Sequence, residues 1–175
     1  CYLELADLLW NRLDRQRALR LYRFAACLED KDEYLAMRYF DALAVLGRTQ
    51  EALDWLTHRF ERFGKQSMQP AVSLYQALDR LRRHADGIAV LERAIELRPD
   101  DTELALFVVH SLAMTSSKYW PRAESLLQSV KDRAQERGWK EAASRLAVMR
   151  GDWAEGLEHL RDLLPRSPLS MDLRE

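Results

Sequence analysis

Small residues recur along this chain at a nearly constant interval. Successive members are 34, 35, 36 and 33 residues apart, at Ala18, Ala52, Gly87, Ala123 and Gly156. Apolar residues follow most of them four and seven positions later, as Leu91 and Ala94 follow Gly87. These offsets place the residues on one face of a helix, where a small residue lets a neighbouring helix approach closely. The pattern therefore predicts one closely packed helix in every segment of roughly 34 residues.

A second apolar pattern precedes the first in each segment and keeps the same period. Its most regular members are 34, 35 and 34 residues apart, at Leu9, Leu43, Leu78 and Leu112. Strands would require alternating polar and apolar residues, and the sequence lacks that alternation. We therefore predict an all-α domain spanning residues 1–175, with about ten helices paired as antiparallel hairpins and no sheet. The approximate repeats are 1–31, 32–67, 68–101, 102–136 and 137–170.

Residues that favour helix ends agree with these repeats. Asp30 and Asp100 each precede a glutamate by three positions, which is the spacing of a capping box at a helix start. Pro121 is expected in the first turn of a helix, where its missing N–H costs nothing. Pro99 and Pro168 are expected to end helices, because proline cannot continue one.

Residues 87–101, which read GIAVLERAIELRPDD, resemble the second helix and linker of a tetratricopeptide repeat (TPR). Residues 151–168 and 46–56 resemble the same motif, and five degenerate copies in phase cover essentially the whole chain. The resemblance implies a right-handed superhelix, with the first helix of each hairpin on the concave face and the second outside. The sequence departs from the family at Phe40, Tyr75 and Val109, where a small residue is usual, and about two extra residues lie near 116–120.

Composition narrows the class of protein. Hydrophobic residues make up 47% and charged residues 31%, with a net charge of -1, which excludes a disordered tail and a strong field toward nucleic acid or anionic membranes. Cys1 and Cys27 do not form a disulfide framework, and Cys27 is expected to be buried in an apolar helix. The start at Cys1 and a potential further helix at 170–175 predict that this is a fragment of a longer protein. We favour a cytoplasmic location slightly over a periplasmic one. The Arg-, Leu- and Ala-rich composition suggests a bacterial source.

The sequence contains no complete motif for catalysis or metal binding. Residues 64–67 resemble the end of a phosphate-binding loop, but Arg59 stands in place of the preceding glycine and Gln66 in place of the required Ser or Thr. The histidines fall in four different repeats without consistent metal-ligand spacing, at His58, His84, His110 and His159. We therefore expect no enzymatic activity, cofactor or metal in this fragment. The tryptophans are expected to fill gaps between hairpins. Trp120 is the exception, because it lies in the inserted turn and is the candidate among them for stacking on a ligand.

The expected function is to bind a protein or peptide in the concave groove. Amide and guanidinium groups on successive first helices can pair with the backbone or acidic side chains of an extended peptide. The predicted partner-binding residues are Asp7, Asn11, Arg38, Asp41, Gln69, Gln76, Arg80, His110 and Arg145. The Lys/Asn clamp that TPR co-chaperones use for a C-terminal carboxylate is missing, because its positions hold Leu3, Asp7, Met37 and Asp41.

Alternative functions follow from other features. The chain could be a TPR module of a larger enzyme, such as a glycosyltransferase, or of an envelope polysaccharide assembly protein, positioning a substrate or partner. Nucleic-acid binding is a second alternative, suggested by a basic cluster of Arg80, Arg82, Arg83 and His84. We disfavour it because no aromatic residues that could stack on bases lie among these cations. The terminal repeats lack a clearly polar outer helix, which would suit a homo-oligomer.

Overall fold

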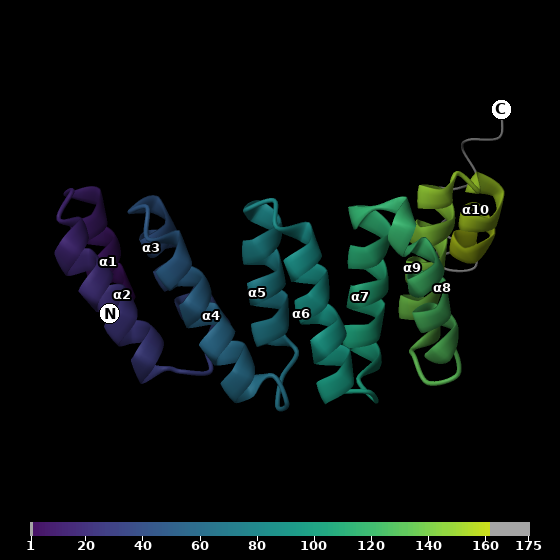
Figure 1. Cartoon of the computed structure of the whole chain (residues 1–175), viewed down its shortest axis with the longest axis horizontal. Coiled ribbons are helices and arrows are strands. Elements are labelled where there is room, and N and C mark those ends of the chain that lie inside the picture. Colours follow the sequence, from purple (N-terminus) through teal and green to yellow (C-terminus); the bar gives the residue numbers. More distant parts are fainter. Residues whose placement is uncertain (1, 162–175) are drawn as a thin grey trace, which may run out of the picture. The chain divides into compact units, whose positions relative to one another are not determined.

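A computed structural model of the chain describes residues 2–161, which form ten α-helices and one short 3₁₀ helix and contain no strand (Figure 1). The predicted helical hairpins and the absence of a sheet are thus confirmed for this part of the chain. The helices are α1 (Tyr2–Asn11), α2 (Arg15–Leu28), α3 (Glu33–Val45), α4 (Thr49–Phe63), α5 (Gln69–Arg80), α6 (His84–Leu97), α7 (Thr102–Thr115), η1 (Ser117–Tyr119), α8 (Trp120–Ser129), α9 (Glu136–Arg150) and α10 (Trp153–Arg161). The predictions for Cys1, Pro168 and the segment 170–175 lie outside the described residues.

The chain divides into two compact units, Cys1–Leu97 and Arg98–Glu175. In the first unit each helix packs mainly on the next one along the chain, from α1 to α6, and α3 also contacts α5. In the second unit α7 packs on α8 and α9, and α9 packs on α10. Within each unit the contacts are therefore those of stacked hairpins, in which every helix is covered by near neighbours in sequence.

The periodic small residues lie buried against neighbouring side chains. Ala18, Ala52 and Ala123 are completely buried. A Cβ atom added at Gly87 would lie 3.1 Å from a ring carbon of Tyr75, and one at Gly156 would lie 2.7 Å from a methyl carbon of Val148. Larger side chains would displace the facing helix, which explains the recurrence of small residues at this position.

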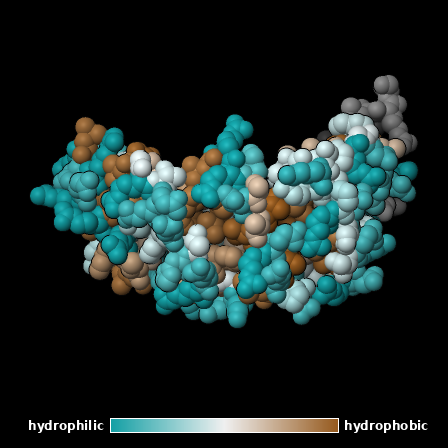
Figure 2. All heavy atoms as spheres, viewed as in Figure 1, coloured by the Kyte–Doolittle hydropathy of each residue, from teal (hydrophilic) through white to brown (hydrophobic). Residues whose placement is uncertain are grey.

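Aliphatic side chains from both helices of the hairpins fill the interior. The largest side chains with almost no exposed surface include Leu43, Leu56, Leu91, Leu104 and Leu112. Hydrophilic residues cover much of the face drawn in Figure 2, with hydrophobic side chains showing between them. No helix in residues 2–161 is long and apolar enough to cross a lipid bilayer.

The burial predicted for Cys27 is wrong, because this thiol is exposed. Ala25 and Ala26 face the core, and the next residue is turned about 100° further round the helix, which brings Cys27 to the outer surface. The presence of alanines beside a cysteine did not reveal which side of the helix it occupies.

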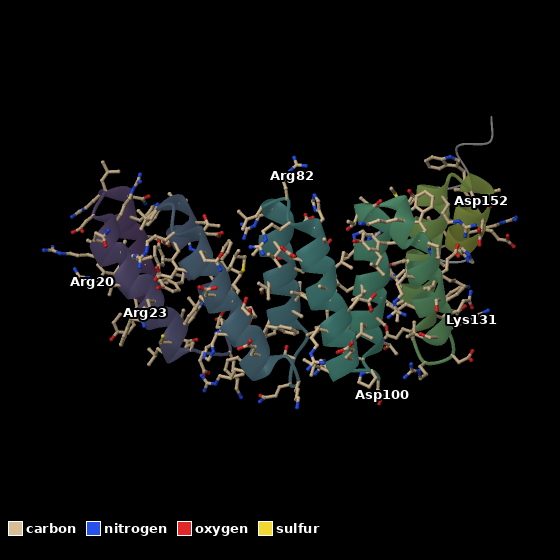
Figure 3. All side chains as sticks on the ribbon, viewed as in Figure 1. Arg20, Arg23, Arg82, Asp100, Lys131 and Asp152 are labelled. Atoms are coloured by element: carbon tan, nitrogen blue, oxygen red, sulfur yellow. The ribbon has the colours of Figure 1, made fainter. Side chains whose placement is uncertain are left out.

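The predicted helix caps are each displaced by one or two residues. The carboxylate of Asp32, not Asp30, accepts the N–H of Leu35 at 3.1 Å and caps α3. The carboxylate of Asp101, not Asp100, accepts the N–H of Leu104 at 3.0 Å and caps α7. Asp100 lies in the loop before α7, where Figure 3 labels it. Each of these loops holds more than one aspartate, and only the backbone path selects the one that caps.

The loop between α7 and α8 accommodates the extra residues of the fourth hairpin. They form η1, and Pro121 lies in the first turn of α8 as predicted. The indole N–H of Trp120 donates a hydrogen bond to the carbonyl oxygen of Ala113 at 3.2 Å. Trp120 therefore joins the start of α8 to α7 in this structure.

Hairpin turns use left-handed backbone conformations, at which glycine is usual. Gly47 and Gly151 have φ values of 75° and 88°. Leu13 and Arg82 occupy the equivalent turns after α1 and α5 with φ values of 65° and 60°. Figure 3 shows the Arg82 side chain projecting outward from the α5–α6 turn.

Candidate functional site

Polar pairs link successive first helices in each unit. These helices are α1, α3 and α5 in the first unit and α7 and α9 in the second. In each unit we call the surface that carries the pairs the first-helix face of that unit. The pairs are Asp7–Arg38, Asp41–Arg80 and His110–Arg145. Six of the nine predicted partner-binding residues are thus brought together two by two, each pair joining adjacent hairpins.

The pair between α1 and α3 forms a small network with a buried phenol. The Tyr22 hydroxyl donates a hydrogen bond to the Asp7 carboxylate at 2.5 Å, and the Arg38 guanidinium donates to the same oxygen. Arg38 also lies over the Tyr22 ring, 5.3 Å from its centroid. Burial and the hydrogen bond to Asp7 raise the pKa of Tyr22 to about 12. The phenol therefore remains a proton donor to Asp7 throughout the physiological range.

A pocket of about 400 Å³ opens beside this network in the first unit. Its polar side is formed by four predicted residues: Asp7, Asn11, Arg38 and Asp41. Its apolar side is formed by Trp10, Ala42 and Val45, and Val45 is 62% exposed. We call this cavity the first-helix pocket. It offers a hydrophobic surface beside carboxylate, amide and guanidinium groups, which is the arrangement that orients an amphipathic ligand.

The other two predicted residues of α5 do not join the first-helix pocket. Gln76 is exposed on α5. Gln69 lies at the start of α5 and lines a separate cavity of about 490 Å³ together with Lys31 and Glu33. The two predicted amides of α5 therefore lie at different levels of this helix and outside the first-helix pocket.

A buried ionic network, which sequence reasoning missed, joins α3, α4 and α5. Arg59 is only 3% exposed, and its guanidinium donates to Glu33 at 2.6 Å and to the carbonyl oxygen of Asp30 at 2.5 Å. The second oxygen of Glu33 accepts the Ser73 hydroxyl at 2.9 Å. Arg59 occupies the position where the apolar repeat pattern is interrupted, and that interruption was the signal available in the sequence.

The polar pair of the second unit places a cation beside a histidine. A guanidinium nitrogen of Arg145 lies 3.0 Å from Nδ1 of His110. Burial and the positive charge of Arg145 both lower the pKa of His110. The neutral imidazole is therefore favoured, and its Nδ1 can accept a hydrogen bond from the guanidinium.

The basic cluster at the α5–α6 turn is largely compensated by carboxylates. Arg80 pairs with Asp41, Arg83 with Asp86 at 2.6 Å, and His84 with Asp79 at 2.8 Å. Arg82 makes no ion pair with the residues that the structure describes. This arrangement does not provide the row of available cations that phosphate backbones require.

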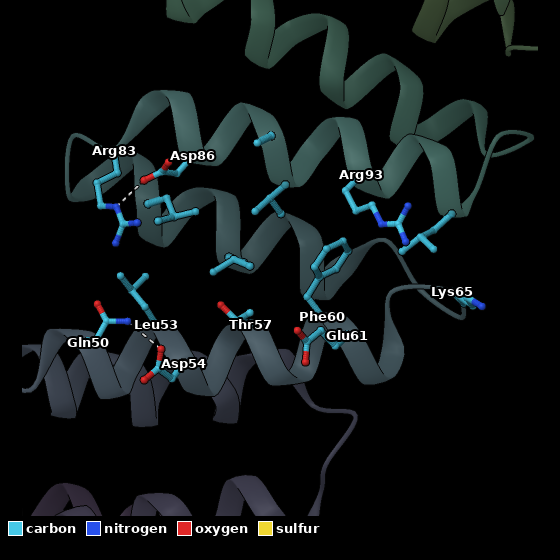
Figure 4. A pocket seen from close by; sticks show the side chains of 15 residues that line it. Gln50, Leu53, Asp54, Thr57, Phe60, Glu61, Lys65, Arg83, Asp86 and Arg93 are labelled. Carbon is cyan, nitrogen blue, oxygen red and sulfur yellow. Dashed lines mark hydrogen bonds and ion pairs between the residues drawn. The ribbon is translucent and has the colours of Figure 1, made fainter.

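A further cavity in the first unit lies away from the predicted residues. It measures about 670 Å³ and lies between the second helices α4 and α6 (Figure 4). Leu53 and Phe60 of α4 and Leu74 and Leu78 of α5 contribute apolar surface to it. None of the nine predicted partner-binding residues lines this cavity.

Comparisons with known proteins identify the fold. No protein-family model matches the chain, and no curated protein is similar to it in sequence. Solved structures are similar over nearly the full length. YrrB, described as a TPR protein with an unusual peptide-binding site, is 22% identical with a TM-score of 0.53, and the match covers 98% of this chain and 89% of YrrB.

Two further structures give the same result. The TPR protein TTC0263 of Thermus thermophilus is 21% identical with a TM-score of 0.58, over 99% of this chain and 93% of that protein. MamA of Desulfovibrio magneticus RS-1 is 17% identical with a TM-score of 0.55, over 99% and 96% of the two chains. Together with the stacked hairpins and the buried small residues, these similarities show that this chain has the fold of the tetratricopeptide repeat proteins.

Proposed function

We propose that this chain is a non-catalytic scaffold that binds an extended segment of a partner protein on the first-helix face of its first unit. The observation that carries the proposal is the first-helix pocket, in which Asp7, Asn11, Arg38 and Asp41 surround one cavity beside apolar surface. YrrB shares the fold and has a peptide-binding site, which supports the same class of function here.

The chemistry of the pocket suits a peptide with an apolar side chain flanked by main-chain amides. The apolar side chain would cover Trp10 and Val45, and the exposed Asn11 amide can both donate to and accept from a peptide backbone. Burying one such side chain contributes about 1.5–3 kcal/mol, and each hydrogen bond adds about 0.5–1.5 kcal/mol. A single pocket therefore supports weak binding, and useful affinity requires contacts along several first helices.

The ion pairs set a condition on any test of this proposal. Arg38 satisfies Asp7 and covers Tyr22, so replacing it with glutamate would place two carboxylates together and disturb the fold. Asn11 is better suited because it is exposed at the pocket. Asn11→Arg adds bulk and charge there while leaving the Asp7–Arg38 pair in place.

The experiment selects peptides from a displayed random library against the intact chain and measures their affinity by fluorescence anisotropy. We expect the selected peptides to bind Asn11→Arg at least tenfold more weakly than the native chain. Gln16→Arg is the matched control, because Gln16 is an exposed amide on α2 and does not line the pocket. Equal binding to the two variants, or a selection that yields no peptide, would contradict the proposal.

A further inference from the structure

The cavity between α4 and α6 has the form of an open groove. Its floor includes Leu74 and Leu78 of α5, which lies behind the two second helices (Figure 4). Side chains near the middle of the two walls are small, with the exposed Thr57 on α4 and Ala89 on α6. Small side chains leave the space between the helices unfilled, and we call this cavity the second-helix groove.

The α4 wall of the groove is acidic. Figure 4 shows Asp54 and Glu61 on α4, on the side that faces the cavity. Asp54 accepts a hydrogen bond from Gln50 at 2.8 Å, and neither carboxylate forms an ion pair with a residue that the structure describes. The two acids are seven positions apart, which corresponds to two helical turns, or about 10.5 Å.

The α6 wall carries charges that are already paired. Arg83 pairs with Asp86 at 2.6 Å, and Arg93 pairs with Glu96 at 2.7 Å. Lys65, which follows the end of α4, also lines the groove. The acidic part of the groove is therefore confined to α4, at Asp54 and Glu61. A partner would gain most from cations on the edge that faces Asp54 and Glu61, and from apolar side chains over the floor.

We propose that the second-helix groove binds an amphipathic helix of a partner protein, with an apolar stripe and two Lys or Arg residues seven positions apart along one edge. A helix suits the groove because residues seven apart lie on one side of it and repeat at the spacing of the two acids. Its apolar residues, three or four positions apart, would enter the space above Thr57 and Ala89. This surface is distinct from the first-helix pocket.

The test uses a fluorescein-labelled synthetic peptide about four turns long. Leucines form its apolar stripe and two lysines seven residues apart form its edge. Binding to the intact chain is measured by fluorescence anisotropy at low and moderate salt. We expect saturable binding that the double variant Asp54→Lys/Glu61→Lys weakens at least tenfold, which corresponds to about 1.4 kcal/mol.

Two controls separate a specific charge match from general attraction. Asp132→Lys/Glu158→Lys makes the same change in net charge at exposed residues outside the groove, and it should leave the affinity within about twofold. A second peptide with glutamates in place of the two lysines should bind the Asp54→Lys/Glu61→Lys variant better than it binds the native chain. Circular dichroism checks that both variants retain their helices.

Several outcomes would overturn the proposal. These are failure of the lysine peptide to bind, equal binding to the two charge variants, and failure of the glutamate peptide to recover affinity. Self-association through the groove, seen by analytical ultracentrifugation and lost in Asp54→Lys/Glu61→Lys without any peptide binding, would assign the surface to a second copy instead. Asn11→Arg should not change binding of the lysine peptide, so this test is independent of the first-helix pocket.

Discussion

Replacing the buried Arg59 with methionine should destabilise the first unit strongly. Methionine keeps much of the length of the side chain but removes the ion pair to Glu33 and the hydrogen bond to the Asp30 carbonyl group. Removing one partner of a buried ion pair costs about 3–5 kcal/mol, because the other charge remains without compensation. Glu33 is 18% exposed and keeps its hydrogen bond from Ser73, so we place the expected loss at the lower end, about 3 kcal/mol.

Urea denaturation followed by far-ultraviolet circular dichroism measures this loss. With a denaturant slope of about 2 kcal/mol/M, the midpoint should fall by about 1.5 M. Arg93→Met is the matched control, since Arg93 also lies on a second helix and pairs with a glutamate, but with 61% of its side chain exposed. That variant should lose less than about 1 kcal/mol.

A double-mutant cycle with Glu33→Gln tests the cause of the loss. The uncharged amide removes the uncompensated carboxylate, so the double variant should be more stable than the sum of the two single changes predicts, by about 1 kcal/mol or more. If Arg59→Met were no more destabilising than Arg93→Met, or if the cycle were additive, the buried ion pair would not stabilise the unit as we argue.

Three further predictions concern other positions. Gly87→Leu should lower the free energy of unfolding by about 1–3 kcal/mol, because even a Cβ there lies 3.1 Å from an aromatic ring of α5; an unchanged melting temperature would refute this packing. Asp101→Ala should lower the free energy of unfolding by about 1 kcal/mol at neutral pH and Asp100→Ala by much less, as measured by urea denaturation. The reverse order would indicate that Asp100 caps α7, as the sequence predicted. Burial alone would raise the pKa of Asp101, but hydrogen bonds to its carboxylate lower it. The difference in the free energy of unfolding between the native chain and Asp101→Ala should therefore shrink as the pH falls below about 4. Arg145→Gln should raise the pKa of His110 in an NMR titration, and an unchanged pKa would exclude the contribution of Arg145. Because the pKa of His110 is depressed in the folded state, the second unit of the native chain should lose stability as the pH falls below about 6.5.

The fold could be predicted because it depends on local patterns. A helix face that must meet a neighbour needs small residues at fixed positions, and Ala18, Ala52 and Ala123 are buried as their spacing requires. Helix starts were less predictable, since Asp100 and Asp101 offer the same carboxylate and differ only in backbone conformation. Exposure of Cys27 depends on the direction of one helix face, which the repeat pattern defined only approximately.

The candidate site was predictable only in part. Helical phase identified residues that occur together on the first helices, but it did not indicate which of them form pairs, such as Asp41 and Arg80. The partners of Arg59 lie 26 and 29 residues earlier in the chain, so the interrupted apolar pattern marked Arg59 without identifying the groups that pair with it. The second-helix groove arises from space that side chains fail to fill, and a sequence does not display empty volume.

The neighbour-to-neighbour packing within each unit has a consequence for how the protein acquires its structure. Contacts between residues close in sequence require little loop closure, and chains dominated by them fold quickly. The first hairpin needs only α1 and α2 to meet, so it can form while later residues are still being added by the ribosome. Each new hairpin would then dock on a surface that is already in place, which shortens the time that its apolar side is open to aggregation.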